Sequence, residues 1–89
     1  MKIEISEDVV WRELGGEVLI LDLASQHYFG LAGSGSDMWQ LIAEHGSSDT
    51  VIDRMLAKYG VDPANLKADF EKLVDELAAK GMVRVSRGD

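Results

Sequence analysis

The hydrophobic period of the chain changes once, within the segment HYFGLAGSGSDMW at residues 27–39. Before this segment the apolar residues follow strand-like patterns, and after it they recur at the three- and four-residue spacings of helices. A chain with one such change groups its strands first and its helices second, which is typical of the α+β class. The Gly-Ser-Gly-Ser stretch is therefore a joint between the two parts, a hinge, or a phosphate-binding loop.

The glycine-rich stretch matches neither of the common phosphate-binding motifs. A P-loop needs a Gly-Lys-Ser/Thr sequence, and no lysine lies near residues 30–37. The dinucleotide-binding pattern fails because Met38 stands where its third glycine is required. Ser34, Ser36 and Asp37 instead suit a helix N-terminus, so we interpret the stretch as a joint whose polar side chains cap the first helix.

Three strands are predicted before the joint. Residues 9–14 and 17–23 flank Gly15-Gly16, a pair that accepts the positive φ angles of a two-residue hairpin turn. The second of these runs is apolar on both pleat faces, as expected for a central strand that is covered on both sides. A polar turn then leads to residues 27–31. Because consecutive hairpins form a meander, this third strand is expected at a sheet edge.

Three amphipathic helices are predicted after the joint, each from one apolar stripe. The stripes consist of Met38, Leu41 and Ile42, then Val51, Ile52, Met55, Leu56 and Tyr59, and finally Leu66, Phe70, Leu73, Val74 and Leu77. Residues typical of helix ends separate them, with Ser48 or Asp49, Asp62 and Pro63 at starts and Gly46, Gly60 and Gly81 at ends. Residues 82–86 resemble a terminal strand or wing.

The composition limits the possible functions. The 89 residues are 46% hydrophobic and 28% charged, with no break in composition, which predicts one globular domain over residues 1–89. A formal net charge of −7 argues against nucleic acid and anionic membranes as partners. The sequence contains no run of about 20 apolar residues and no signal-peptide pattern, so we expect a cytoplasmic protein.

The residues needed for catalysis or metal binding are missing. The chain has no cysteine, and its serines lie in turns and caps without a paired histidine. His27 and His45 lack the spacing of metal ligands. The carboxylates at residues 69–76 alternate with lysines, which is typical of a solvated helix face. We therefore expect no enzymatic activity, no metal site and no cofactor.

Two adjacent aromatic residues are poorly explained by a structural role. Trp11, Trp39 and Phe70, together with the methionines, are interpreted as core. Tyr28 and Phe29 are neighbours in a strand, so they point to opposite faces and one of them cannot join the main core. An aromatic side chain displayed at an uncovered sheet edge indicates a binding partner.

Residues 22–39 resemble the motif of PqqD-like proteins, the recognition elements for RiPPs (ribosomally synthesised and post-translationally modified peptides). The matching positions are Leu21-Asp22, Tyr28-Phe29, Leu31, Gly35 and Met38-Trp39, and residues 70–77 and 80–83 resemble the family's closing pattern. The resemblance therefore covers nearly the whole chain. Ala32 departs from it, because the family usually has an asparagine there whose side chain would bond the turn.

The resemblance implies a winged helix-turn-helix-like fold with a three-stranded antiparallel sheet followed by three helices. It also implies that the protein binds the leader segment of a precursor peptide as an added strand, over a groove shared with the third helix. The Tyr-Phe-Gly-Leu stretch is most similar to the leader-binding proteins of lasso-peptide biosynthesis. Such proteins present the precursor to a leader-cleaving cysteine protease or another maturation enzyme.

The candidate peptide-binding residues lie on the third strand and the third helix. They are His27, Tyr28, Phe29, Gly30, Leu31, Asp69, Phe70, Leu73, Glu76 and Leu77. Asp69 and Glu76 lie on one side of the helix stripe, and Lys67 and Ala78 lie on the other. The sequence leaves open which of these two flanks lines the groove.

Two alternatives also remain open. A peptide chaperone for a radical-enzyme pathway, such as pyrroloquinoline quinone synthesis, would share the fold and the mode of binding. A winged-helix DNA-binding protein would use residues 63–80 for recognition. That segment carries three lysines against four carboxylates, which fits a phosphate backbone poorly.

Overall fold

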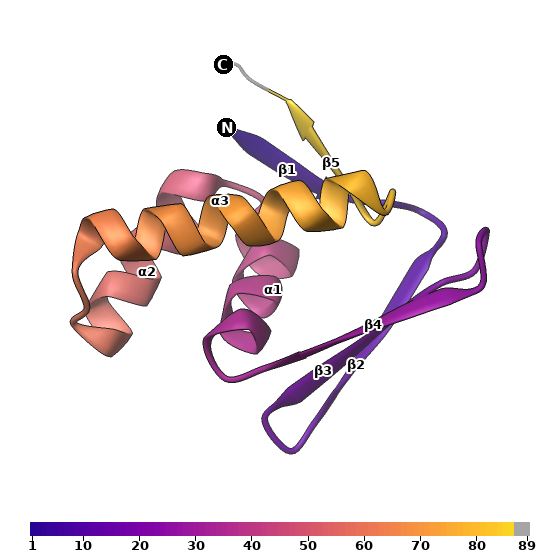
Figure 1. Ribbon diagram of the computed structural model, residues 1–89, viewed down its shortest axis with the longest axis horizontal. Helices are drawn as coiled ribbons and strands as arrows, with labels where there is room; N and C mark the ends of the chain where they lie inside the picture. The colour runs from indigo at the N-terminus through magenta and orange to yellow at the C-terminus, as the bar shows by residue number, and fades with distance from the viewer. Residues whose placement is uncertain (87–89) are drawn as a thin grey trace.

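The computed structural model describes residues 1–86 and shows four strands, three helices and a last strand in chain order (Figure 1). The elements are β1 (Lys2–Ile5), β2 (Val9–Leu14), β3 (Glu17–Asp22), β4 (His27–Ala32), α1 (Ser34–His45), α2 (Ser48–Tyr59), α3 (Pro63–Ala79) and β5 (Val83–Ser86). β2, β3 and β4 form one antiparallel sheet in that order, and β1 pairs with β5 in a second. The predicted α+β class, with a three-stranded antiparallel sheet followed by three helices, is confirmed.

The two hairpins of the larger sheet have different turns. Gly15 and Gly16 both have positive φ angles, which confirms the predicted two-residue turn between β2 and β3. The turn between β3 and β4 depends on Asp22, whose buried carboxylate accepts the Ala24 N–H at 3.0 Å and the Ser25 hydroxyl at 3.1 Å. This aspartate therefore fixes the turn that leads into β4.

The prediction that β3 is covered on both faces is wrong. Val18 and Ile20 are buried at the helix-facing side, whereas Leu19 on the opposite side is 46% exposed. The reason is that the helices pack against one side of the sheet, and among residues 1–86 no element lies on the other. We call these two sides the inner face and the outer face.

β1 and β5 bring the two ends of the described chain together. They pair antiparallel from Lys2↔Ser86 to Ile5↔Val83, which confirms the predicted terminal strand. Ile3 and Val83 are buried by this pairing. The small sheet therefore holds the segment before β2 against the end of α3.

Only some of the predicted helix-capping residues lie at the helix ends in the structure. Asp62 caps α3 as predicted, because its carboxylate accepts the Ala64 N–H at 3.2 Å. Gly46 and Gly60 take the predicted left-handed conformation after α1 and α2. Gly81 also has a positive φ, one residue beyond the end cap of α3.

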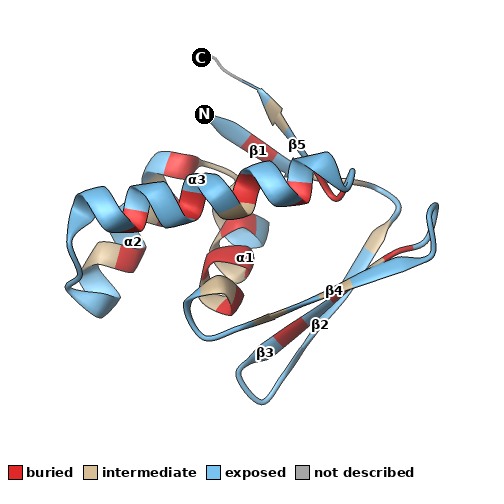
Figure 2. Ribbon diagram, in the orientation of Figure 1, coloured by how far each residue is buried: buried red, intermediate tan, exposed pale blue. Residues whose placement is uncertain are grey.

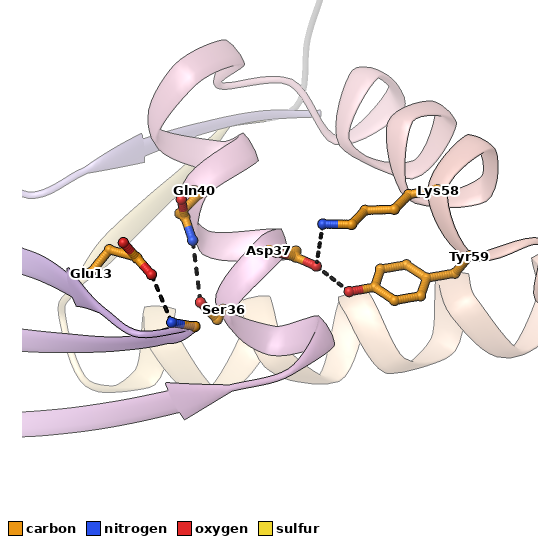
Figure 3. Close-up of polar contacts among 7 residues, drawn as sticks. Glu13, Ser36, Asp37, Gln40, Lys58 and Tyr59 are labelled. Atoms are coloured by element: carbon orange, nitrogen blue, oxygen red, sulfur yellow. Dashed lines mark hydrogen bonds and ion pairs between the residues drawn. The ribbon is translucent and has the colours of Figure 1, made fainter.

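The predicted caps of α1 are wrong. Gly33 occupies the N-cap position, and no side chain bonds the first turn of this helix. Ser36 is buried within the helix, where its hydroxyl accepts a hydrogen bond from Gln40 Nε2 at 3.3 Å, and Asp37 bonds to α2 instead (Figure 3). The start of α2 is displaced similarly, since Ser47 is its N-cap and Ser48 and Asp49 lie inside it.

The core lies between the inner face of the larger sheet and the three helices (Figure 2). Its buried apolar residues are Ile3, Val18, Ile20, Met38, Trp39, Ile42, Val51, Met55, Leu66, Phe70, Val74, Leu77, Met82 and Val83. Trp39 is fully buried as predicted, and Trp11 packs edge to face against it at 6.1 Å between ring centroids. The prediction that Trp11 is core is wrong: it lies on the edge strand β2 and remains 38% exposed.

Replacement by alanine should have opposite effects on stability at two glycines of the larger sheet and its turns. A Cβ at Gly16 or at Gly30 would meet no atom within 4 Å, so packing is not the difference. Gly16 has a φ of +88°, which an L side chain adopts at a cost of about 1 kcal/mol, and we expect Gly16→Ala to be destabilising. Gly30 has no positive φ, and Gly30→Ala should raise the free energy of unfolding by about 0.5 kcal/mol.

Urea unfolding of the two variants and the wild type measures both effects. Each variant is the control for the other, because both add one methyl group to the same sheet. If both variants changed the free energy of unfolding equally and in the same direction, the explanation from the φ angles of the two glycines would be contradicted.

Candidate functional site

β4 is an edge strand of the larger sheet. It pairs with β3 from Glu17↔Ala32 to Asp22↔His27, and no described strand pairs with its other side (Figure 1). In an edge strand every second residue directs its backbone N–H and C=O away from the sheet. β4 therefore presents an unpaired ladder of hydrogen-bonding groups, as the sequence predicted.

The side chains of β4 alternate between the two faces of the sheet. Phe29 and Leu31 lie opposite Ile20 and Val18 on the inner face, where they are half-buried against the core. Tyr28 lies on the outer face and is 75% exposed. This confirms the expectation that only one of the two adjacent aromatics joins the core.

One flank of α3 lies toward β4. Lys80, at the end of α3, places its ammonium 5.5 Å from the centre of the Phe29 ring. Asp69 lines a cavity together with Ser34, which follows β4 by two residues. Asp69, Glu76 and Lys80 are seven and four residues apart, so they share one face of the helix.

The opposite flank of α3 lies elsewhere. Lys67 lines a different cavity, with Asp49, Ile52 and Asp53 of α2. The flank that carries Asp69 and Glu76 is therefore the one associated with β4. We call the surface formed by β4 and this flank the β4–α3 surface.

A cavity of about 390 Å³ opens at the C-terminal end of β4. Its lining comes from all three helices and the connection between α2 and α3: Ser34, Met38, Met55, Tyr59, Val61, Asp62, Asn65, Leu66 and Asp69. Met38, Met55 and Leu66 give it an apolar floor, and Asp62 and Asp69 contribute carboxylates to its lining. This volume suits a large side chain or a small ligand.

Tyr59, which lines this cavity, belongs to a cluster of three polar side chains (Figure 3). The Tyr59 hydroxyl donates a hydrogen bond to Asp37, and Lys58 Nζ lies 3.0 Å from the same carboxylate oxygen. Since Asp37 is in the first turn of α1 and the other two residues end α2, the cluster ties these helix ends together. We call it the Asp37 cluster.

The cluster shifts the pKa values of its members. The hydrogen bond from Tyr59 is the main cause that lowers the pKa of Asp37 below its ordinary 3.8, and Lys58 adds to it against the opposing effect of burial. The same contacts with Asp37 raise the pKa of Lys58 and of Tyr59. All three shifts favour the charged carboxylate, the charged ammonium and the protonated phenol at neutral pH.

The predicted site residues differ in how much surface they offer. His27, Tyr28, Gly30, Asp69 and Glu76 are exposed, whereas Phe29, Leu31 and Leu73 are half-buried, and Phe70 and Leu77 are almost fully buried in the core. The last two therefore support the β4–α3 surface from below in this structure.

Sequence reasoning missed Lys80 and the cavity. The eleven-residue spacing of Lys80 from Asp69 places it on the same flank and could have indicated it. The cavity had no signal in the sequence, because its lining residues are spread over three helices and the α2–α3 connection, which only the packing of the helices brings together.

Residues 1–86 were also considered for a metal site and for a membrane-spanning helix. Within residues 1–86 no group of three or more histidine, aspartate or glutamate side chains is placed to hold a metal ion. None of the helices in that range is both long enough and apolar enough to cross a bilayer.

Comparison with known proteins identifies one matching family. The sequence profile of the family described as "Coenzyme PQQ synthesis protein D (PqqD)" matches residues 17–83, which run from β3 to the first residue of β5. A search of curated proteins finds no match.

Two solved structures are similar over almost the whole chain. One is "TbiB1 in Complex with the TbiA(beta) Leader Peptide", with 30% identity, a TM-score of 0.89, and coverage of 96% of this chain and 99% of that chain. The other is "Lasso peptide synthetase B1 complexed with the leader peptide", with 19% identity, a TM-score of 0.83, and coverage of 96% and 100%. The second likeness shows a shared fold.

The Asp37 cluster should make stability depend on pH in the acid range. A lowered pKa means that the stabilisation is present above the unfolded-state value near 3.8 and is lost as the pH falls through the folded-state value. We expect Asp37→Asn to lower the free energy of unfolding by about 0.5–1 kcal/mol at pH 7. The difference from wild type should shrink between about pH 4 and pH 2.

Thermal and urea unfolding from pH 2 to pH 7 measures this difference. Asp53→Asn is the matched control, because Asp53 is exposed and its side chain makes no hydrogen bond or ion pair with residues 1–86. If the difference in the free energy of unfolding between Asp37→Asn and wild type did not depend on pH, the stabilising role of the charged Asp37 carboxylate would be contradicted.

Proposed function

Since this chain belongs to the PqqD family of leader-peptide-binding RiPP recognition elements, we propose that it holds the leader segment of a precursor peptide as an added strand beside β4. The members of this family are non-catalytic peptide-binding proteins. The observation that carries the proposal is the open edge of β4, whose outward N–H and C=O groups lack a described strand partner. An extended peptide satisfies such groups with its own backbone.

The inner side of the added strand would meet the β4–α3 surface. Alternate leader side chains point toward that side, where Phe29, Leu31 and Leu73 offer half-buried apolar area. The intervening side chains point to the outer face. Main-chain bonds then supply affinity that depends little on sequence, and the apolar contacts supply selectivity.

The cavity at the end of β4 gives this strand an anchor. Its apolar floor suits a large apolar or aromatic leader side chain. Asp62 and Asp69 in its lining favour a basic residue nearby in the leader, because opposite charges attract each other. The Asp37 cluster joins the start of α1 to the end of α2 beside this cavity.

We further propose that the precursor belongs to a lasso-peptide pathway, in which the protein presents it to a leader-cleaving cysteine protease or another maturation enzyme. The Tyr-Phe-Gly-Leu stretch of β4 and the fold shared with lasso peptide synthetase B1 support this pathway. The alternative is a chaperone for a radical enzyme of the pyrroloquinoline quinone type. It is supported by the description of the matching family as a coenzyme PQQ synthesis protein.

A DNA-binding role is not favoured by the charges on α3. The flank toward β4 carries Asp69 and Glu76 against Lys80, and the chain as a whole has a net charge of −7. A protein that neutralises several phosphates needs clustered lysine and arginine side chains.

Salt dependence separates the two kinds of complex. We expect leader affinity to change less than about fivefold between 50 and 200 mM salt, because exposed ion pairs contribute only about 0–1 kcal/mol. A DNA complex with several phosphate contacts would lose roughly 10³-fold or more over the same range. Calorimetric titrations with the precursor's leader and with duplex DNA measure both. Tight, steeply salt-dependent DNA binding without leader binding would contradict the proposal.

Backbone methylation of the leader tests strand addition directly. If the leader pairs with β4, the N–H of every second leader residue donates to β4. N-methylation of any one of these residues removes one ladder hydrogen bond and should lower the affinity about tenfold. Methylation of the intervening residues, whose N–H groups face away from β4, is the matched control and should have little effect.

The TbiA(beta) leader peptide, which is bound by the similar protein TbiB1, serves as a second probe beside the precursor's own leader. Fluorescence anisotropy of the labelled peptides gives each affinity. Losses that do not alternate along the peptide would contradict strand addition while leaving leader binding itself intact.

A further inference from the structure

Lys80 lies at the end of α3, next to the open edge of β4. It is exposed, and its ammonium is 5.5 Å from the centre of the Phe29 ring. Among residues 1–86 no carboxylate forms an ion pair with it, although Glu76 is one helical turn away on the same flank. The positive charge of Lys80 is therefore available to a bound peptide.

Along the α3 residues on the flank toward β4, which are spaced seven, seven and four residues apart, the charge changes sign once. Asp62, Asp69 and Glu76 are negative, and Lys80 ends the row with a positive charge. α3 and β4 run in opposite directions (Figure 1). The negative part therefore lies toward the end of β4, where Asp62 and Asp69 line the cavity, and the positive part lies by Phe29.

A leader strand beside β4 would place one of its side chains next to Lys80. The leader residue paired with Phe29 points to the inner face, as Phe29 does, and the two Cβ atoms are about 4.5–5.5 Å apart. The Lys80 ammonium is at a similar distance from the Phe29 ring, so it lies within reach of a leader carboxylate at this position. The added strand would also shield the two charges from water, which strengthens their attraction.

The direction of the leader follows from the sheet. Both strand pairs in the larger sheet are antiparallel, and an antiparallel pair is slightly more stable than a parallel one. An antiparallel leader has its N-terminal part by the cavity and its C-terminal part by Lys80. Asp69 and Lys80 are eleven residues apart, or about 16 Å along the helix, which corresponds to about five residues of a strand. Because only every second leader residue faces inward, a spacing of about four or six residues results.

We propose that Lys80, placed over the Phe29 ring, selects an acidic leader residue at the position that pairs with Phe29, and that Asp69 selects a basic residue about four or six positions earlier. The inference rests on the proposed function and adds a specificity element to it. The two charges set the register and the direction of the leader together. A reversed leader would place like charges next to each other at both ends of the site.

Charge scanning of the leader tests this assignment. The probes are the precursor's own leader and the TbiA(beta) leader peptide, each synthesised with glutamate and, separately, with lysine at every position in turn. Fluorescence anisotropy gives the two affinities, and their ratio at each position reports the preferred charge. With the wild type we expect one position to prefer glutamate about fivefold, and a position about four or six residues before it to prefer lysine about fivefold.

Substitutions in α3 assign each preference to a residue. Lys80→Met keeps a long side chain without the charge and should reduce the glutamate preference to less than about twofold, and Lys80→Glu should reverse it. Asp69→Asn should remove the lysine preference alone. Lys67→Glu, on the opposite flank of α3, is the matched control and should leave every ratio unchanged. Thermal unfolding checks that each variant folds.

A purely structural role of Lys80 has a different result. It would weaken the binding of all peptides equally and leave the ratios at their wild-type values, which would overturn the proposal. Even ratios along the leader with the wild type, equal changes with Lys67→Glu, or a glutamate position that precedes the lysine position would also overturn it. Absence of binding of the precursor's own leader by the wild type would overturn the proposed function itself.

Discussion

The packing of α1 against the inner face of the three-stranded sheet is the contact on which the rest of the structure depends. α1 begins two residues after β4, so the chain must fold back at Gly33, and Trp39 then fills the space beneath β2 and β3. This arrangement buries Val18 and Ile20 and commits the helices to one side of the sheet. It thereby leaves the outer face of the sheet and the free edge of β4 open.

The features associated with peptide binding are a backbone edge, a helix flank and a cavity. β4 offers a backbone ladder, one flank of α3 provides a wall, and three helices converge on an apolar cavity at the strand's end. The Asp37 cluster joins the ends of α1 and α2 beside that cavity.

Charge is distributed unevenly over the fold. Carboxylates lie along the exposed sides of the helices, where they contribute most of the net charge of −7, whereas the outer face of the sheet has one Arg12 and one Glu17. An acidic surface discourages nucleic acid and other polyanions. The repulsion of polyanions is weakest at the neutral apolar face.

The sequence by itself determined the features that depend on neighbours along the chain. The hairpin at Gly15-Gly16, the change from strand to helix period, the edge position of β4 and the opposite directions of Tyr28 and Phe29 follow from local conformation and periodicity. Only the tertiary structure decided which flank of α3 lies toward β4, that Trp11 and Leu19 remain exposed, that Gly33 and not a serine caps α1, and where the cavity opens. These features depend on which elements pack together, and the periodicity of a single element does not contain that information.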